Sequence, residues 1–357
     1  MDAAALRAEF PVLTDLAYLN SGTCGPLAHA TVRAAIDVLD RAAAEGRGRD
    51  YMGLRLALGE RQRAAYAAML GAAPADVALT TSTSDGVVRV LAGLDLGPGD
   101  EILTAPDEHP GLLGPLGTLR ARRGVQVRTA PFADLADAVG PRTRLVACSH
   151  VSWVTGAVRP EGLADVDVPV LLDGAQGVGA VPTDVTALGC AFYAGSGQKW
   201  LCGPVGCGML WVAPEWRERL APVGSTYVNL ADPAGALDSS PHAEARRHDA
   251  PALAPETSAA AVAGHDVLAA HGWPAVHARA AGLAGQLAQW LADAGRTVAP
   301  RGATTLVAWE DPDPEASRER IAERGVIVRD LPGTRYLRAS VGAWNDETDL
   351  QRLLGAL

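Results

Sequence analysis

Short apolar runs alternate with longer helical patterns through the middle of the chain. The runs are rich in Val, Leu and Ala, and they lack the polar alternation of a half-exposed strand, which is typical of strands buried on both faces. They predict seven strands, at residues 77–81, 101–105, 125–129, 145–149, 170–173, 191–194 and 208–212. Strands that alternate with helices indicate an α/β fold with a mostly parallel, doubly wound sheet.

Helical patterns lie on both sides of this region. Residues 1–13 predict a short helix that ends at Pro11, and residues 28–70 predict two helices interrupted near Gly46 to Gly48. An Ala-rich helical segment over 256–296 is followed by predicted strands at 304–308, 326–329 and 336–340 and by a final helix from Asp346. We therefore expect a large domain over residues 14–255 and a smaller C-terminal α/β domain over residues 256–357, completed by residues 1–13.

Composition excludes several classes of protein. The 357 residues carry a net charge of −10 and scattered arginines, so no basic stripe is present for nucleic acid. The five cysteines are odd in number and lack C-x-x-C spacing, which argues against a disulfide framework and a zinc site. No long apolar run begins the chain, so we expect no signal peptide or membrane span and predict a cytoplasmic location with reduced thiols.

Lys199 is the only lysine among 31 basic residues. Arginine stays protonated in proteins, whereas a desolvated lysine amine can lose its proton and attack a carbonyl to form a Schiff base. Lys199 lies in a glycine-rich stretch from Ser196 to Gly208, where a cofactor can approach the backbone closely. An ordinary surface lysine is the alternative.

The residues that follow each predicted strand are candidates for chemistry, because ligands bind beyond the carboxyl ends of the strands in doubly wound sheets. Thr81-Ser-Thr-Ser84 precedes a helix expected near Val87, so its hydroxyls can cradle a phosphate. Simple capping of that helix by Ser84 or Asp85 is an equal alternative.

Two other strand ends carry titratable side chains. Asp173 directly follows an apolar run, and a partly buried carboxylate needs a cationic or N–H partner, which a pyridinium nitrogen would supply. Capping of a following helix is the alternative for Asp173. His109, after the second strand, predicts by itself only a loop histidine.

Together these pieces resemble the class V aminotransferase family of pyridoxal 5'-phosphate (PLP) enzymes with the type I fold, which includes cysteine desulfurases, C–S lyases and isopenicillin-type epimerases. The resemblance covers nearly the whole chain and implies a homodimer that acts on a small amino acid. Its motifs are Asn20-Ser-Gly-Thr, Thr81-Ser-Thr-Ser, Glu108-His109, Ser149-His-Val-Ser-Trp-Val-Thr-Gly156, Asp173-Gly-Ala-Gln176, Ser196-Gly-Gln-Lys199 and Arg338-Ala-Ser340 with Asn345.

The resemblance implies roles for the cofactor-binding residues. Lys199 would form the Schiff base with PLP and move protons, and Asp173 would pair with the pyridinium nitrogen. Gln176 would donate to the ring hydroxyl oxygen and His109 would stack on the ring. The phosphate would be held by Ser82, Thr83, Ser196 and Gln198.

The resemblance also implies a substrate site. Arg338 would bind the substrate carboxylate with its two-pronged guanidinium, beside Asn20 and Trp153. Arg329 would read a second carboxylate or contact a loop, with a surface salt bridge as the alternative.

Departures from the family pattern bear on the reaction. Desulfurases need a late cysteine to take up sulfur as a persulfide, and no cysteine follows Cys207. Trp153 stands where desulfurases place an asparagine, a feature closer to C–S lyases and epimerases. Ala252 stands where the family has a threonine that reaches the phosphate across the dimer.

The sequence therefore predicts a β-eliminating C–S lyase on cysteine, cystine or a cysteine S-conjugate, giving pyruvate and ammonia. The alternatives are a class V aminotransferase, an amino-acid epimerase, a desulfurase with an atypical thiol among Cys24, Cys202 and Cys207, and a non-catalytic PLP-binding protein.

Overall fold

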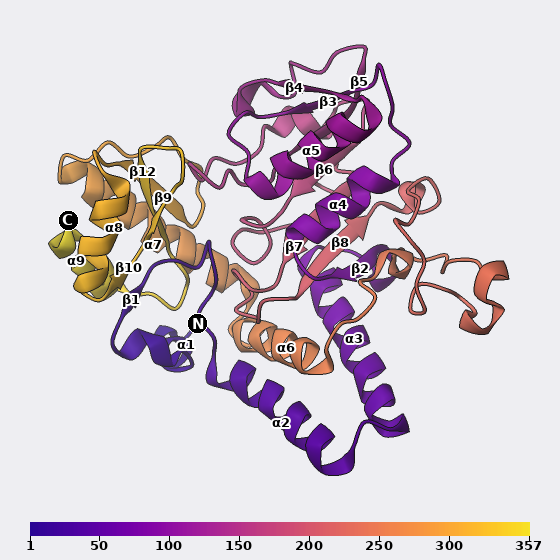
Figure 1. The fold of residues 1–357 in the computed structure, drawn as a ribbon. Helices are drawn as coiled ribbons and strands as arrows, with labels where there is room; N and C mark the ends of the chain where they lie inside the picture. Colours follow the sequence, from indigo (N-terminus) through magenta and orange to yellow (C-terminus); the bar gives the residue numbers. More distant parts are fainter.

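A seven-stranded sheet forms the centre of the larger of two lobes in the computed structural model, which describes residues 1–357 (Figure 1). Only β8 runs antiparallel to its neighbours. The prediction of a seven-stranded, mostly parallel sheet is thus confirmed. In spatial order the strands are β2 (Val77–Thr80), β8 (Gly208–Val212), β7 (Phe192–Ser196), β6 (Val170–Asp173), β5 (Thr143–Ser149), β3 (Glu101–Thr104) and β4 (Gln126–Thr129).

Helices cover both faces of this sheet. Successive strand residues point to opposite faces, so Leu171 packs into the cluster beneath α4 (Thr83–Gly93) and α5 (Pro110–Arg123). Its neighbour Leu172 packs into the cluster beneath α3 (Arg49–Met69) on the other face. Because both faces are buried, the strands are continuous apolar runs.

A helical hairpin projects from the larger lobe. It consists of α2 (His29–Glu45) and α3, and α6 (Pro255–Ala269) packs against both (Figure 1). Residues 213–254 form no α-helix or strand, only short 3-10 turns at Pro214–Trp216, Pro233–Asp238 and Ala245–His248. Part of this segment, drawn orange in Figure 1, projects from the body of the larger lobe.

The smaller lobe contains two small sheets. In the first, β12 (Tyr336–Ser340) pairs antiparallel with β9 (Leu306–Glu310) and β11 (Arg329–Asp330); in the second, β1 (Ala17–Tyr18) pairs with β10 (Val326–Ile327). The helices of this lobe are α1 (Ala3–Ala8), α7 (Trp273–Asp293), α8 (Pro314–Glu323) and α9 (Glu347–Ala356). No helix of the chain is long and apolar enough to cross a membrane.

Several boundaries differ from the sequence prediction. The strand expected over 326–329 is divided at Val328 into β10 and β11, which join different sheets. The helix expected over 256–296 is broken before Trp273, where Gly272 has φ +79°. Helix α4 begins at Thr83 rather than near Val87, because the Ser82 side chain accepts from Asp85 N and caps it. The domain boundary at residue 256 stays a prediction.

The strand directions bring the candidate residues to one edge of the sheet. Strands β2, β3, β5, β6 and β7 all end there, and β8 begins there. Register places Ser196 and Thr80 on either side of Gly208, and Ser149 beside Asp173. This edge therefore carries most of the predicted site.

Gly86 of α4 gives a test of how closely the helix packs on the sheet. A helical Gly→Ala change usually stabilises by about 1 kcal/mol, but a Cβ at Gly86 would lie 2.9 Å from Ala194 Cβ in β7. We expect Gly86→Ala to destabilise by about 1–3 kcal/mol through overpacking. Urea unfolding measures this change. Gly53→Ala is the control, since no atom lies within 4 Å of its Cβ position in α3, and it should stabilise; a stabilised Gly86→Ala variant would contradict the packing.

Candidate active site

Lys199 lies in a tight loop that follows β7. Gly197 N donates to Cys207 O at 3.0 Å, and Cys202 adopts φ +53°, a strained conformation for a residue with a side chain. The N-terminal turn lies directly on this loop, since Gly25 N donates to Gln198 O at 2.8 Å and a Cβ on Gly25 would lie 2.0 Å from Lys199 O. Only glycine fits this contact.

The Lys199 amine is surrounded by charged groups. Burial lowers its pKa, the negative charge of Asp173 opposes that effect, and the positive charges of Arg338 and Arg329 lower the pKa further, to about 8. The residue as a whole is half-buried. A large fraction of the amine is therefore neutral near pH 8, as a nucleophile or general base requires.

Asp173 is the last residue of β6 and is only 5% exposed. Its carboxylate accepts one hydrogen bond, from Ala175 N at 3.0 Å, and forms no ion pair in the structure. Burial raises its pKa, and the charge of Lys199 opposes the rise. The chain forms turns rather than an α-helix after Asp173, so capping of a following helix does not explain this buried carboxylate, whereas an N–H of a bound ring does.

Gln176 is held beside Asp173 by two neighbours. Its Nε2 donates to Gly22 O at 2.8 Å, and its Oε1 accepts from Trp200 Nε1 at 3.0 Å. A Cβ on Gly22 would lie 2.9 Å from Arg338 Nη2 and 3.1 Å from Gln176 Oε1. The turn at Gly22 therefore lies between Gln176 and Arg338, and one amide proton of Gln176 is left for a ligand.

His109 caps helix α5. Its Nδ1 accepts from Gly111 N at 2.9 Å, so Nε2 carries the proton of the neutral ring. Burial and the charges of Lys199, Arg329 and Arg338 lower its pKa to about 4. The Trp153 ring lies against it edge to face, with centroids 5.0 Å apart. A neutral, fixed imidazole suits the predicted stacking role.

The residues predicted to hold a phosphate meet at the start of α4. The buried hydroxyls Thr83 Oγ1 and Ser196 Oγ have no hydrogen-bond partner, and neither does Gln198 Oε1. A Cβ on Gly208 would lie 2.8 Å from Ser82 N, so the backbone is closely approached here. Unpartnered hydroxyls at a helix N-terminus suit an anion, and these residues therefore fit the phosphate of PLP.

Two arginines from the smaller lobe face the same site. Arg338 is fully buried on β12; its Nη1 donates to Trp153 O, while Nε and Nη2 have no partner. Burial and the neighbouring Arg329 lower the Arg338 pKa to about 9. Arg329 lies opposite Arg338 in register and donates to Thr23 Oγ1 at 2.9 Å, with no ion pair. Unpaired guanidinium groups of this kind suit an anionic ligand.

Asn20 and Trp153 support this arrangement. Asn20 Oδ1 accepts from Thr23 Oγ1 at 2.7 Å, and Asn20 forms a bridge with Ser340. The Trp153 indole N–H already donates to Asp107 O at 2.8 Å and the side chain is 9% exposed. Trp153 therefore acts through its ring and its carbonyl rather than as a free donor.

Sequence reasoning gave no role to several residues of the site. Trp200 orients Gln176, Thr23 holds Arg329, and Glu108 is buried beneath His109 with hydrogen bonds from Ser149. Their signal in the sequence was only their place inside the motifs. No group of three or more His, Cys, Asp or Glu side chains could hold a metal ion.

Comparisons with known proteins show a family and a fold that this chain shares. The family model described as aminotransferase class-V matches residues 17–353. Isopenicillin N epimerase of Streptomyces clavuligerus is 30% identical over 95% of this chain and 93% of its own, and a probable cysteine desulfurase of Pseudomonas aeruginosa is 33% identical over 80% and 78%. The cystine C-S lyase C-DES, solved with its reaction product cysteine persulfide, superposes with a TM-score of 0.90 at 26% identity, over 97% of this chain and 98% of that one.

The pKa of Lys199 can be tested directly, because it is the only lysine. We expect a small acylating reagent to modify Lys199 with a pH midpoint of about 8 rather than the ordinary 10.5. Mass spectrometry of the peptide that contains Lys199 measures the rate, with a free lysine peptide as reference. Asp173→Asn should lower the midpoint, because Asp173 raises the pKa of the amine. A midpoint near 10.5 would mean that the amine is exposed.

Proposed function

Because the chain belongs to the aminotransferase class-V family, we propose that it is a PLP-dependent C–S lyase that acts on cystine, cysteine or a cysteine S-conjugate. It is an enzyme of the desulfurase and lyase group, and a structural relative of 25% identity carries glycine covalently linked to the PLP cofactor. The family model and the geometry of the site support this reading over a non-catalytic binding protein.

The burial of the thiols favours a lyase over a desulfurase. All five cysteines are free, and Cys148, Cys190, Cys202 and Cys207 are buried. Burial raises the pKa of Cys190 and of Cys207 to about 12, so these thiols are poor nucleophiles. Cys24 alone is half-buried, in the N-terminal turn. No exposed cysteine in the C-terminal part of the chain can take up sulfur as a persulfide. The sulfur would therefore leave the enzyme as part of the product.

Bound PLP would supply an electron sink for the pair left on the substrate Cα. Asp173 would keep the pyridine nitrogen protonated, and Gln176 and His109 would fix the ring. Thr83 and Ser196 would hold the phosphate with their unpartnered hydroxyls. Lys199 Nζ would remove the Cα proton, since its pKa of about 8 leaves a substantial neutral fraction of the amine near pH 8.

The overall reaction on cystine balances with one water. The Cα–H proton passes to Lys199, the Cβ–S bond breaks, and its electron pair leaves with the sulfur as cysteine persulfide. The remaining three-carbon fragment takes up one water and yields pyruvate and ammonia. No external oxidant or reductant is needed.

The two arginines would select the substrate. Arg338 would bind the α-carboxylate, and the partly buried Arg329, which lacks an ion pair, would bind a second carboxylate. Cystine carries two carboxylates and cysteine only one. The arginine pair therefore favours cystine or an acidic S-conjugate.

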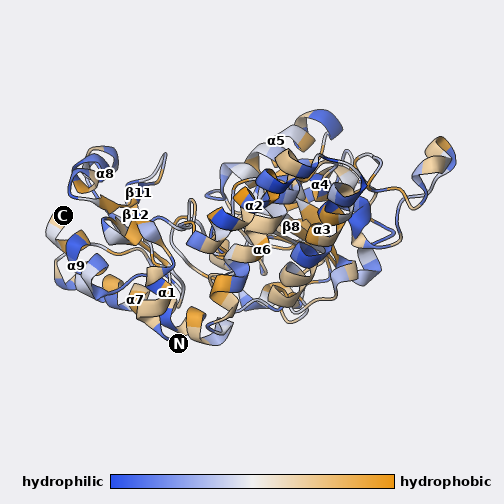
Figure 2. Cartoon of the chain, turned by 90° about the horizontal axis from the view of Figure 1, so that it is seen from below, coloured by the Kyte–Doolittle hydropathy of each residue, from blue (hydrophilic) through white to orange (hydrophobic).

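We also propose that the enzyme is a homodimer and cytoplasmic. Exposed apolar side chains form a stripe on the outer faces of α2 and α3, at Val32, Ile36, Leu39, Met52 and Leu56. Seen from below, hydrophobic positions are interspersed with hydrophilic ones over α2, α3 and α6 (Figure 2). A stripe of this size supports pairing with a second copy, and the free cysteines support a reducing compartment.

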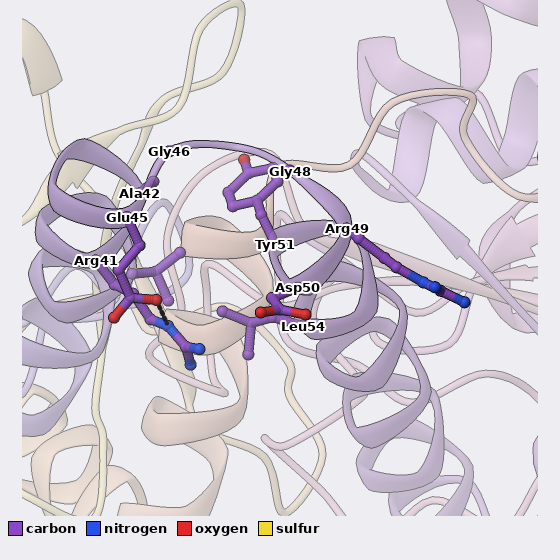
Figure 3. Close-up of a pocket in the computed structure, with 10 residues that line it drawn as sticks. Arg41, Ala42, Glu45, Gly46, Gly48, Arg49, Asp50, Tyr51 and Leu54 are labelled. Atoms are coloured by element: carbon purple, nitrogen blue, oxygen red, sulfur yellow. Dashed lines mark hydrogen bonds and ion pairs between the residues drawn. The ribbon is translucent and has the colours of Figure 1, made fainter.

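A small cavity lies at the tip of the same hairpin, away from the candidate active site. It measures about 140 Å³ and lies between α2 and α3 beside Tyr51, with the Arg41–Glu45 ion pair at its rim (Figure 3). It contains none of the predicted site residues, so it has no part in the proposed chemistry.

Product analysis tests the proposed reaction. Holoenzyme with cystine should give pyruvate, ammonia and cysteine persulfide in equal amounts, and Cys24→Ser should retain most of that activity. Lys199→Ala should lose at least about 10³-fold in turnover, because the base is removed. Alanine as product would support a desulfurase, inverted amino acid an epimerase, and an aminated cofactor with keto acid a transaminase; full turnover by Lys199→Ala would exclude every version.

Arg329 can be tested by comparing substrates. Arg329→Gln should raise KM for cystine by roughly 10- to 100-fold with a smaller change in kcat, because a charge-assisted bond contributes about 1.5–3 kcal/mol. S-methylcysteine, which has one carboxylate, should be affected far less. Steady-state kinetics on both substrates measure this, with the exposed Arg335→Gln as control. Equal losses on both substrates would mean that Arg329 reads no second carboxylate.

A further inference from the structure

Glu108 is a buried carboxyl that the proposed chemistry does not use. It is 4% exposed and lies in the turn after β3, directly before His109. One of its oxygens accepts from Ser149 N at 2.8 Å, and the other contacts Ser149 Oγ in a short hydrogen bond. Both bonds go to the last residue of β5, so Glu108 ties the turn that carries His109 to the edge of the sheet.

Asp173, at the end of the neighbouring strand β6, lies beside the end of β5. Ser149 pairs with Asp173 in register, and His150 N donates to Asp173 O at 2.8 Å. Glu108 and Asp173 are therefore two carboxyl groups attached to adjacent strand ends at one buried edge. Two such groups cannot both be ionised without a large cost.

Lys199 offsets the charge of Asp173, but no cation acts on Glu108. Neither Glu108 nor Asp173 forms an ion pair, and the titratable groups that face Glu108 are Asp173 on β6, Asp107 in its own turn and the buried Cys148 thiol on β5. Burial raises the pKa of Glu108, the bonds from Ser149 oppose this, and the charges of Asp173 and Asp107 add to it, giving about 8. At pH 7 the carboxyl is then mostly neutral, and its two oxygens stay hydrogen-bonded to Ser149 N and Ser149 Oγ.

We propose that Glu108 is a positioning residue: as a neutral acid it fixes the turn of His109 to β5 and leaves Asp173 the only ionised carboxyl of the pair. The proposal rests on the proposed function only for the identity of PLP as the group that Asp173 and His109 hold. A merely structural, ionised Glu108 is the competing explanation.

The melting temperature of the apoprotein, measured as a function of pH, distinguishes a neutral Glu108 from an ionised one. A folded-state pKa above the ordinary 4.5 means that the stability from neutral Glu108 is complete below about pH 4.5 and is lost as pH rises through about 8. Glu108→Gln keeps both hydrogen bonds but cannot ionise. Its Tm relative to the natural protein should therefore rise by about 2–4 °C between pH 5 and pH 9.

The exposed Asp134→Asn variant controls for the loss of one carboxylate and should track the natural protein. A Glu108→Gln curve parallel to the natural one at all pH values would overturn the neutral acid. The unfolding experiment needs neither PLP nor substrate. Its result therefore tests the neutral Glu108 independently of the proposed lyase activity.

Cofactor binding tests the positioning role. At pH 7, Glu108→Gln should bind PLP within about threefold of the natural protein, whereas Glu108→Ala should weaken binding by about tenfold or more, because the turn of His109 is released. Titration of apoprotein with PLP, followed by its visible absorbance, gives both values. Equal binding by Glu108→Ala and the natural protein would overturn the role, and failure of all three proteins to bind PLP would contradict the proposed function instead.

Discussion

Burial of unpaired charge at one edge of the sheet is the constraint on which the rest of the site depends. Asp173 and Arg338 both lie close enough to Lys199 to shift its pKa, yet none of the three forms an ion pair within the protein. Charges removed from water without partners are costly. A scaffold must hold them against relaxation: Asp173 ends the buried strand β6, Lys199 lies in the tight loop after β7, and Arg338 is buried on β12 of the smaller lobe.

The second lobe completes that scaffold through close contacts. Thr304 Oγ1 donates to Gly156 O at 2.8 Å, and Arg338 donates to Trp153 O, so the loop that carries Trp153 is held by the smaller lobe. Gly156 has φ +78° and allows no larger residue, since a Cβ would lie 2.9 Å from Thr304 Oγ1. Trp153 in turn contacts His109. A shift of the smaller lobe would therefore also move His109 of the larger lobe.

The sequence predicted the sheet well because buried parallel strands are local features. Their apolar runs are bounded by polar residues, and the seven predicted strands differ from the observed ones by at most about two residues at either end. The sequence did not predict strand boundaries that depend on which neighbouring strand each residue pairs with. Val328 separates β10 from β11 only because the two strands pair with β1 and β12 in different sheets, and no local pattern contains that information.

The candidate site followed from motif order, but its supporting contacts did not. The convergence of Lys199, Asp173 and Gln176 follows from the rule for strand ends. The burial of Glu108 depends on Ser149, 41 residues away, and the orientation of Gln176 depends on Trp200 and Gly22. Such pairings are tertiary, and only the fold reveals them.

The same electrostatics link substrate binding to chemistry under the proposed function. Arg338 and Arg329 both lower the pKa of the Lys199 amine, which enlarges its neutral, nucleophilic fraction before the substrate binds. Carboxylates bound to these arginines would offset their positive charge, so the effect of the arginines on Lys199 would weaken. The amine then becomes a stronger base when the Cα–H bond of the substrate is in place. Binding of the carboxylates therefore contributes to proton removal as well as to recognition.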